Sequence, residues 1–233
     1  MSNKSAEILV TKLGAARRLL RSAIRLHFLR EDELAVHTVA AAAYGILKDL
    51  KKQRGLNEAQ FAMETEMLGW LALAKERVAD QLPASFLSDA YSLQFIDWLV
   101  KVFQITADTD ISKLDFPVVM DSASTAGFWR TNNRASNFLK HADQDSEGAL
   151  SLNDVNNFQL LMNAMFSYES IAPNDLGFEG VVIQLYFLAE NNSKLDLSHP
   201  MYTAVAKLRK MGAEERFEYS AFQLNRPRPD SID

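Results

Sequence analysis

The chain lacks cysteine altogether, and this absence removes several classes of site at once. Its 233 residues contain none, so disulfides, thiolate zinc sites, iron–sulfur clusters and a cysteine nucleophile are excluded. Glycine and proline are also few, with nine and six residues. No glycine-rich phosphate loop, G-x-S-x-G or H-E-x-x-H motif occurs. The absence of cysteine suits the reducing cytoplasm, which is the location we expect.

Long apolar runs and a positive net charge are missing as well. The opening M-S-N-K-S-A-E-I-L-V has no signal-peptide core, and no apolar run approaches the roughly 18 residues that span a bilayer. The formal net charge of −5 gives no general basic field for nucleic acid. We therefore expect neither a membrane nor DNA as a partner, and RNA binding would need a local basic patch.

The chain is rich in the apolar spacing of amphipathic helices. Apolar residues make up 48% of the chain and charged residues 24%, as in ordinary globular proteins. The apolar residues recur every three or four positions through most of the chain. This pattern predicts an all-α fold of seven to nine helices in one domain over residues 1–224. The polar, proline-rich residues 225–233 are expected to form a flexible tail.

The first two predicted helices form an antiparallel hairpin. The apolar pattern runs from about residue 6 to 29, and a second helix, with Asp32 as its N-cap, reaches residue 50 or 52. The alanines at 40–43 allow a neighbouring helix to approach closely. Four arginines of the first helix share another face, which we interpret as a solvated stripe or a patch for an acidic partner: Arg17, Arg18, Arg21 and Arg25.

The same reasoning gives seven further helices. In the helix expected at 88–103 the inward face comprises Tyr91, Phe95, Trp98, Leu99 and Val102. The others are expected at 57–81, 122–141, 153–168, 175–190, 202–211 and 214–222.

Chemically reactive side chains are densest in residues 130–154, R-T-N-N-R-A-S-N-F-L-K-H-A-D-Q-D-S-E-G-A-L-S-L-N-D. Helical spacing aligns Arg130, Arg134 and Asn137, with His141 one turn further and Lys140 beside it. This arrangement indicates an anion site in which Arg130, Asn137 and Lys140 bind the ligand. The alternative is a surface ion-pair cluster, with His141 capping the last carbonyls of its helix.

Part of this segment resembles a known family. The string N-F-L-K-H-A-D-Q-D at 137–145 is similar to the N-F-F-K-H-A-D-x-D signature of an uncharacterised bacterial family of helical proteins. The predicted hairpin resembles the opening of that family, and together the two matches cover about residues 15–50 and 130–160. The resemblance implies a helical fold without assigning chemistry. We interpret the chain as a binding or regulatory module that acts through a homodimer or a protein partner.

The same segment also resembles HEPN domains, helical bundles that often act as ribonucleases. Their motif is an arginine, four to six residues and a histidine, and Arg134 and His141 fit it with six residues between them. The resemblance implies metal-independent RNA cleavage, with His141 as the general acid–base and Arg134 as a phosphate clamp. Two further pairs fall within the four-to-six range, with five residues between Arg21 and His27 and six between Arg30 and His37.

A third interpretation of the segment is a calcium site. Residues 143–154 are similar to a twelve-residue EF-hand loop, with Gly148 at the sharp turn. Carboxylates fall at loop positions one, three, five and twelve: Asp143, Asp145, Glu147 and Asp154. Calcium takes six to eight oxygen ligands, which alternate acids in a turning loop can supply. The alternative is an acidic loop between two helices, with Asn153 as the N-cap of the second.

The remaining histidines fit structural roles. His27 and His37 lie on apolar helix faces and are expected to be hydrogen-bonded core residues. His199, in the sequence S-H-P, is expected to cap a local turn.

Overall fold

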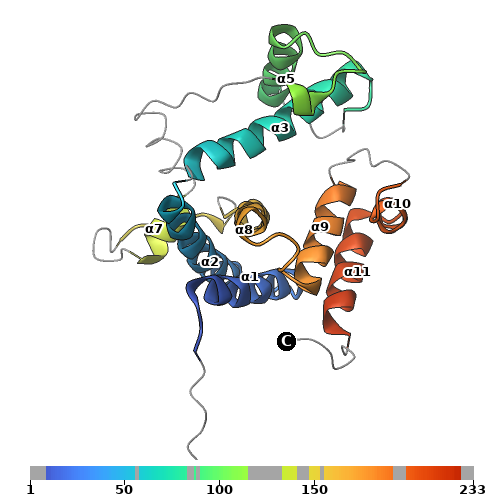
Figure 1. Cartoon of the computed structure of the whole chain (residues 1–233). Helices are drawn as coiled ribbons and strands as arrows, with labels where there is room; N and C mark the ends of the chain where they lie inside the picture. The colour runs from blue at the N-terminus through green and yellow to red at the C-terminus, as the bar shows by residue number, and fades with distance from the viewer. Residues whose placement is uncertain are drawn as a thin grey trace, which may run out of the picture. The chain divides into compact units, whose positions relative to one another are not determined.

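A computed structural model of the chain describes residues 9–55, 58–82, 87, 90–114, 133–140, 147–152, 155–190 and 198–226. Within those ranges the regular structure consists of nine α-helices and one short 3₁₀-helix, with no strand (Figure 1). The prediction of an all-α fold with seven to nine helices is therefore confirmed.

The helices fall into two compact units, which are described separately. Unit 1 contains α1 (Lys12–Phe28), α2 (Glu33–Gln53), α7 (Arg134–Lys140), α8 (Asn157–Ile171), α9 (Phe178–Glu190), α10 (Tyr202–Arg209) and α11 (Ala213–Asn225). Unit 2 contains α3 (Glu58–Val78), α5 (Ala90–Val102) and the 3₁₀-helix η1 (Ile111–Lys113). The single domain over residues 1–224 stays a prediction. Of the expected tail, Asn225 is the last residue of α11, and 227–233 lie outside the described residues.

The N-terminal hairpin forms as predicted, because its turn and its contact face are both encoded locally. Asp32 caps α2, where its Oδ1 accepts from the backbone N–H groups of Leu34 and Ala35 at 3.0 Å each. Ala40 and Ala43 are fully buried, which lets α1 and α2 pack closely along their length (Figure 1).

The turn between α1 and α2 closes by the hydrogen bonds of a Schellman motif. The N–H of Glu31 donates to the Leu26 carbonyl at 3.1 Å, and the N–H of Arg30 donates to the His27 carbonyl at 3.1 Å. Arg30 adopts a left-handed conformation with φ 56°, where glycine is the usual residue. This turn therefore fixes the direction in which Arg30 leaves the backbone.

The core of unit 1 lies where α8 packs along α1 and α2, and where α9 and α11 cover another part of α1 (Figure 1). Complete burial of a large apolar side chain stabilises the folded state by roughly 1.5–3 kcal/mol. The largest buried apolar side chains come from these elements and the α8–α9 loop: Leu20, Ile24, Phe28, Leu47, Leu161, Met162, Tyr168 and Leu176.

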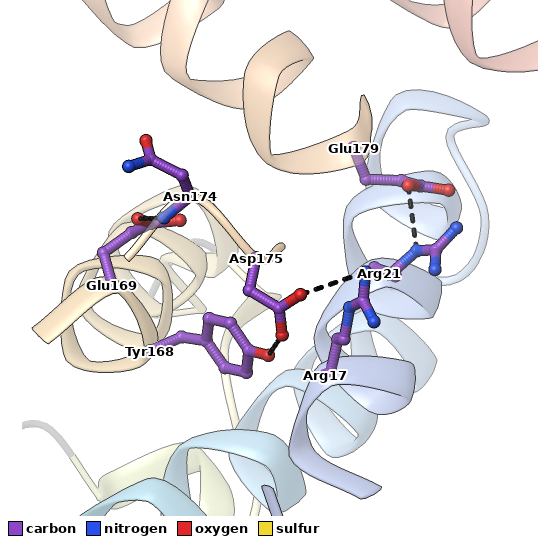
Figure 2. A network of polar contacts seen from close by, with 7 residues as sticks. All are labelled: Arg17, Arg21, Tyr168, Glu169, Asn174, Asp175 and Glu179. Carbon is purple, nitrogen blue, oxygen red and sulfur yellow. Dashed lines mark hydrogen bonds and ion pairs between the residues drawn. The ribbon is translucent and has the colours of Figure 1, made fainter. Parts of the chain in front are cut away.

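A buried carboxylate joins α9 to α1. The side chain of Glu179 is completely buried, and its Oε2 accepts from Nε of Arg21 at 2.9 Å. Its Oε1 accepts from Arg25, with both Nε and Nη2 at 2.7 Å. Figure 2 shows the arginines of α1 reaching towards α9 and the loop before it. The interpretation of these arginines as a solvated stripe is wrong for Arg21 and Arg25, because both bind an acid that follows much later in the chain.

A second set of polar contacts fixes the loop between α8 and α9. The hydroxyl of Tyr168 donates to Oδ2 of Asp175 at 2.8 Å, and Arg17 lies 3.5 Å from the other oxygen of Asp175 (Figure 2). Burial raises the pKa of Tyr168, and its hydrogen bond to Asp175 raises it further, so the hydroxyl stays a donor. Glu169 accepts from the backbone N–H of Asn174 at 2.7 Å. These contacts fix the α8–α9 loop, and the loop in turn positions Glu179 against α1.

Unit 2 has its own apolar core, where α3 packs against α5 and η1. The core residues are Leu71, Ala74, Leu82, Ile96, Leu99 and Ile105. The expected inward face of α5 is partly wrong, because the side chains of Trp98 and Val102 are 50% and 49% exposed. Burial at Ile96 and Leu99 shows that the buried face of α5 is narrower than its apolar composition suggests.

Replacement of Glu179 by glutamine is expected to destabilise the protein by about 3 kcal/mol, because removal of one partner leaves buried charge without compensation. The low end of the usual range applies, since Arg21 and Arg25 are 30% and 42% exposed. Urea unfolding followed by far-UV circular dichroism measures the change. The exposed Glu218→Gln on α11 is the matched control and should stay within about 0.5 kcal/mol of wild type. Equal effects of the two substitutions would show that the buried carboxylate does not hold α9.

Candidate functional site

Four separate segments of unit 1 enclose an open cleft of about 580 Å³. The end of α1, the α1–α2 turn and the start of α2 form one wall, and the first two turns of α11 form the opposite wall. Tyr186 of α9 and Leu152 complete the lining. The volume lies within the range of roughly 300–1,000 Å³ that is typical of small-ligand sites.

The lining of the cleft carries an excess of negative charge. Among the described residues of the lining, the carboxylates belong to Glu31, Asp32, Glu33 and Glu214, and the one guanidinium belongs to Arg30. With neutral His27 the net charge of the lining is −3. The N-termini of α2 and α11 each contribute roughly +0.5, and the C-terminus of α1 contributes roughly −0.5, so the helix dipoles leave the excess in place. The electrostatics of the cleft favour a cation.

Arg30 reaches across the cleft to α11. Its guanidinium carbon lies 4.9 Å from the centre of the Phe217 ring, and its Nη2 pairs with Oε1 of Glu214. The side chains of Arg30 and Glu214 are 57% and 68% exposed, so the ion pair contributes only about 0–1 kcal/mol. The cation–π contact adds about 0.5–1 kcal/mol at such an exposed position. The cleft therefore already holds a guanidinium between an aromatic face and a carboxylate, and holds it weakly.

Aromatic rings form the apolar wall of the cleft. The His27 ring packs 5.6 Å from Phe217 and 6.1 Å from Phe158, and Tyr186 lies 6.2 Å from Phe217. Burial lowers the pKa of His27, and the neighbouring carboxylate of Glu33 raises it in part. Burial raises the pKa of Tyr186, as does the nearby carboxylate of Glu190. Both groups are neutral at pH 7 and act as flat, weakly polar surfaces rather than as charges.

Directly beside the cleft, a buried polar network joins α2, α7 and α8. The side-chain N–H₂ of Asn157 donates to the backbone carbonyl of Glu33 at 2.9 Å and also to the carboxylate of Glu33. The Oδ1 of Asn157 lies 3.2 Å from Nδ1 of His37, and the hydroxyl of Ser136 lies 2.9 Å from Nε2. Through Glu33 this network reaches the lining of the cleft.

The network determines which nitrogen of His37 carries the proton. The backbone carbonyl oxygen and the carboxylate oxygen of Glu33 can only accept hydrogen bonds. The Asn157 amide must therefore direct its nitrogen to them and its oxygen to His37. Nδ1 of His37 therefore donates, and Nε2 accepts from Ser136. Burial lowers the pKa of His37, the hydrogen bond to Asn157 raises it in part, and the charge of Lys140 lowers it again. The expectation of a hydrogen-bonded core histidine is confirmed at this position.

The structure places only some of the residues singled out in 130–154. Arg134, Asn137 and Lys140 are exposed on α7, and Glu147 is exposed in the following loop. The others lie outside the described residues: Arg130, His141, Asp143, Asp145 and Asp154. The described residues contain no group of three or more acids and histidines suited to a metal ion. The anion site, the Arg134–His141 ribonuclease pair and the calcium loop therefore stay predictions.

In the other two arginine–histidine spacings the two residues make different contacts. Arg21 binds Glu179, whereas His27 lines the cleft. Arg30 pairs with Glu214, whereas His37 is buried in the network with Ser136 and Asn157. In neither pair do the arginine and the histidine share a binding partner.

Two smaller expectations can also be decided. His199 caps a turn as predicted, since its Nδ1 accepts from the N–H of Met201 at 3.1 Å. Asn153 is not the N-cap of the helix that follows the acidic loop, because α8 begins at Asn157 and Asn156 caps it. The side-chain oxygen of Asn156 accepts from the N–H of Gln159 at 3.0 Å. The cap lies three residues later because Val155 is buried and belongs to the packed approach to α8.

The cleft was not predicted from the sequence. One signal was present, because Arg30, Glu31, Asp32 and Glu33 are four consecutive charged residues between two apolar helices. Only Asp32 of that run was assigned a role, as a helix cap, and that role is confirmed. Tyr186 and Phe217 carry no such signal, because each resembles an ordinary core aromatic in a helical pattern.

No family model, curated protein or solved structure matches this chain. The resemblances to the bacterial helical family and to HEPN domains therefore stay predictions. Among the described helices, none combines the length and the apolar character that crossing a membrane requires.

His37 is expected to make stability depend on pH. Its folded-state pKa is lowered from 6.5, so the unfolded chain takes up a proton first as the pH falls. The stabilisation that the neutral, buried His37 contributes is complete above pH 6.5. It is lost as the pH falls from 6.5 towards the folded-state pKa, by at most about 1.4 kcal/mol of unfolding free energy per pH unit. His27 acts in the same direction. Urea unfolding at pH 7.0 and 5.5 should show a smaller loss of stability in His37→Gln than in wild type.

The exposed His199 provides the control for this experiment. His199→Gln should change the wild-type difference between the two pH values less than His37→Gln does, because His199 is exposed and caps only a local turn. Most carboxylates titrate below about pH 5, so they contribute little in this range. If His37→Gln loses as much stability as wild type between pH 7.0 and 5.5, the buried imidazole is not the group that titrates.

Proposed function

We propose that this protein is a binding module that holds a small ligand in the cleft between the α1–α2 turn and α11. The observation that carries the proposal is the cleft itself, about 580 Å³ in volume and lined by residues from four segments of unit 1. Sites for small ligands are typically concave, with apolar and aromatic walls and a few polar groups that fix orientation.

The groups that line the cleft are held in fixed positions or in one protonation state. His27 and Tyr186 are held neutral by their surroundings. The carboxylate of Asp32 caps α2, and that of Glu33 accepts from Asn157. These contacts hold the carboxylates in place, which reduces the entropy lost when a ligand binds. The proposal agrees with the interpretation of the sequence as a binding or regulatory module. The homodimer, the RNA partner and the cytoplasmic location stay predictions.

Filling the cleft with a large side chain should abolish ligand binding without unfolding the protein. Ala213 is exposed at the first position of α11 and lines the cleft, so Ala213→Trp places an indole in it. A set of small cationic, anionic and neutral fragments is screened by aromatic NMR, with Tyr186 and Phe217 as reporters. We expect some fragments to shift both reporters in wild type and none to do so in Ala213→Trp.

Thr203→Trp supplies the matched control, because Thr203 is exposed on α10 and does not line the cleft. This variant should bind the same fragments as wild type, and both variants should keep the wild-type melting temperature. Failure of every fragment to shift Tyr186 and Phe217 would contradict the proposal. So would binding that survives in Ala213→Trp.

A further inference from the structure

Arg30 reaches from one wall of the cleft to the other. Its guanidinium lies over the Phe217 ring at 4.9 Å and pairs with Glu214, and both partners belong to α11. The backbone of Arg30 belongs to the α1–α2 turn on the opposite wall. The side chain thus bridges the two walls while 57% of its surface stays exposed. This contact shows which chemical group the wall formed by α11 accepts.

We infer that the ligand of the cleft is a small organic cation, whose guanidinium, amidinium or ammonium group takes the place of the Arg30 guanidinium between Phe217 and Glu214. The inference rests on the proposed function and specifies its ligand class. The apolar body of the ligand then lies against the remaining aromatic wall, which includes His27 and Tyr186.

The charge of the cleft supports a cation over an anion. When Arg30 leaves its contact with Glu214, the four carboxylates of the lining face the ligand. An anion would have to approach Glu31 and Glu33, and the cation of the lining, Arg30, is already paired with Glu214. A neutral molecule would make no use of the carboxylate of Glu214.

The size of the cleft favours a free molecule over the side chain of a partner protein. A volume of about 580 Å³ accommodates an entire small ligand. A single arginine or lysine side chain from a partner would fill only part of that space.

The conformation of Arg30 allows its side chain to be removed without damage to the turn. Its φ of 56° lies in the left-handed region, which glycine adopts freely, so Arg30→Gly keeps the turn and removes the guanidinium. Asp80 has the same backbone conformation, with φ 54°, after the end of α3 in unit 2. Asp80→Gly therefore relieves the same backbone strain and leaves the cleft intact, which makes it a matched control.

The experiment measures binding of benzamidine and benzoate by titration calorimetry and by the NMR signals of Tyr186 and Phe217. The two probes share a ring and differ in charge. Benzamidine should bind wild type and should bind Arg30→Gly about three- to tenfold more tightly, because competition from the internal ion pair and cation–π contact is gone. Introduced into Arg30→Gly, where no internal ion pair remains, Glu214→Gln should weaken binding of benzamidine by a similar factor. Asp80→Gly and Glu215→Gln should leave it unchanged, and benzoate should not bind.

The possible results separate the inference from the proposed function. If benzoate or a neutral fragment binds the cleft and benzamidine does not, the binding module stands and the cationic ligand is overturned. Equal affinity of benzamidine for wild type and Arg30→Gly would overturn the inference that the ligand displaces the Arg30 guanidinium. A capped glycine–arginine–glycine peptide that binds more tightly than agmatine would overturn the free ligand in favour of a partner's side chain. Absence of any binding would overturn both the inference and the proposed function.

Discussion

The two arginines of α1 that enclose the carboxylate of Glu179 set the arrangement on which the rest of unit 1 depends. Apolar packing is non-directional, whereas this carboxylate accepts from a different arginine on each oxygen and so fixes the register of α9 against α1. A buried ion pair of this kind need not add net stability, and its effect here is to select one geometry. The same two helices contribute residues to the cleft. Tyr186 lies two turns beyond Glu179 on α9, and His27 lies two residues beyond Arg25 on α1.

The helices were predictable because their signals are local. Asp32 caps α2 through backbone groups two and three residues away, and the apolar spacing on α1 requires no knowledge of what it contacts. The arginine stripe was misinterpreted because Glu179 lies 154 residues beyond Arg25. An acid in the first turn of a helix is expected from the helix dipole alone, so Glu179 gave no sign of being buried.

The candidate site was harder to predict for a different reason. A dense run of polar residues, such as 130–154, shows where reactive groups are close in sequence, whereas the cleft gathers single residues from distant helices. Among the described residues of that run, Leu152 alone lies in the lining. His37 was assigned correctly to the core, because its position on an apolar face is visible in the sequence. Its partners Ser136 and Asn157 were not predicted, because α7 and α8 are distant from α2 in the sequence and contact it only in the folded chain.

Unit 2 separates the two parts of unit 1 along the chain, and this order has a consequence for synthesis. The α1–α2 hairpin emerges first, and 154 residues separate Arg25 from the carboxylate that it binds. At roughly 5–20 residues per second, the ribosome needs about 8–30 s to add them. During this interval the helices that complete the burial of Leu20, Ile24 and Leu47 have not yet been synthesised. The nascent hairpin therefore leaves these apolar side chains incompletely covered until α8 and α9 have been synthesised.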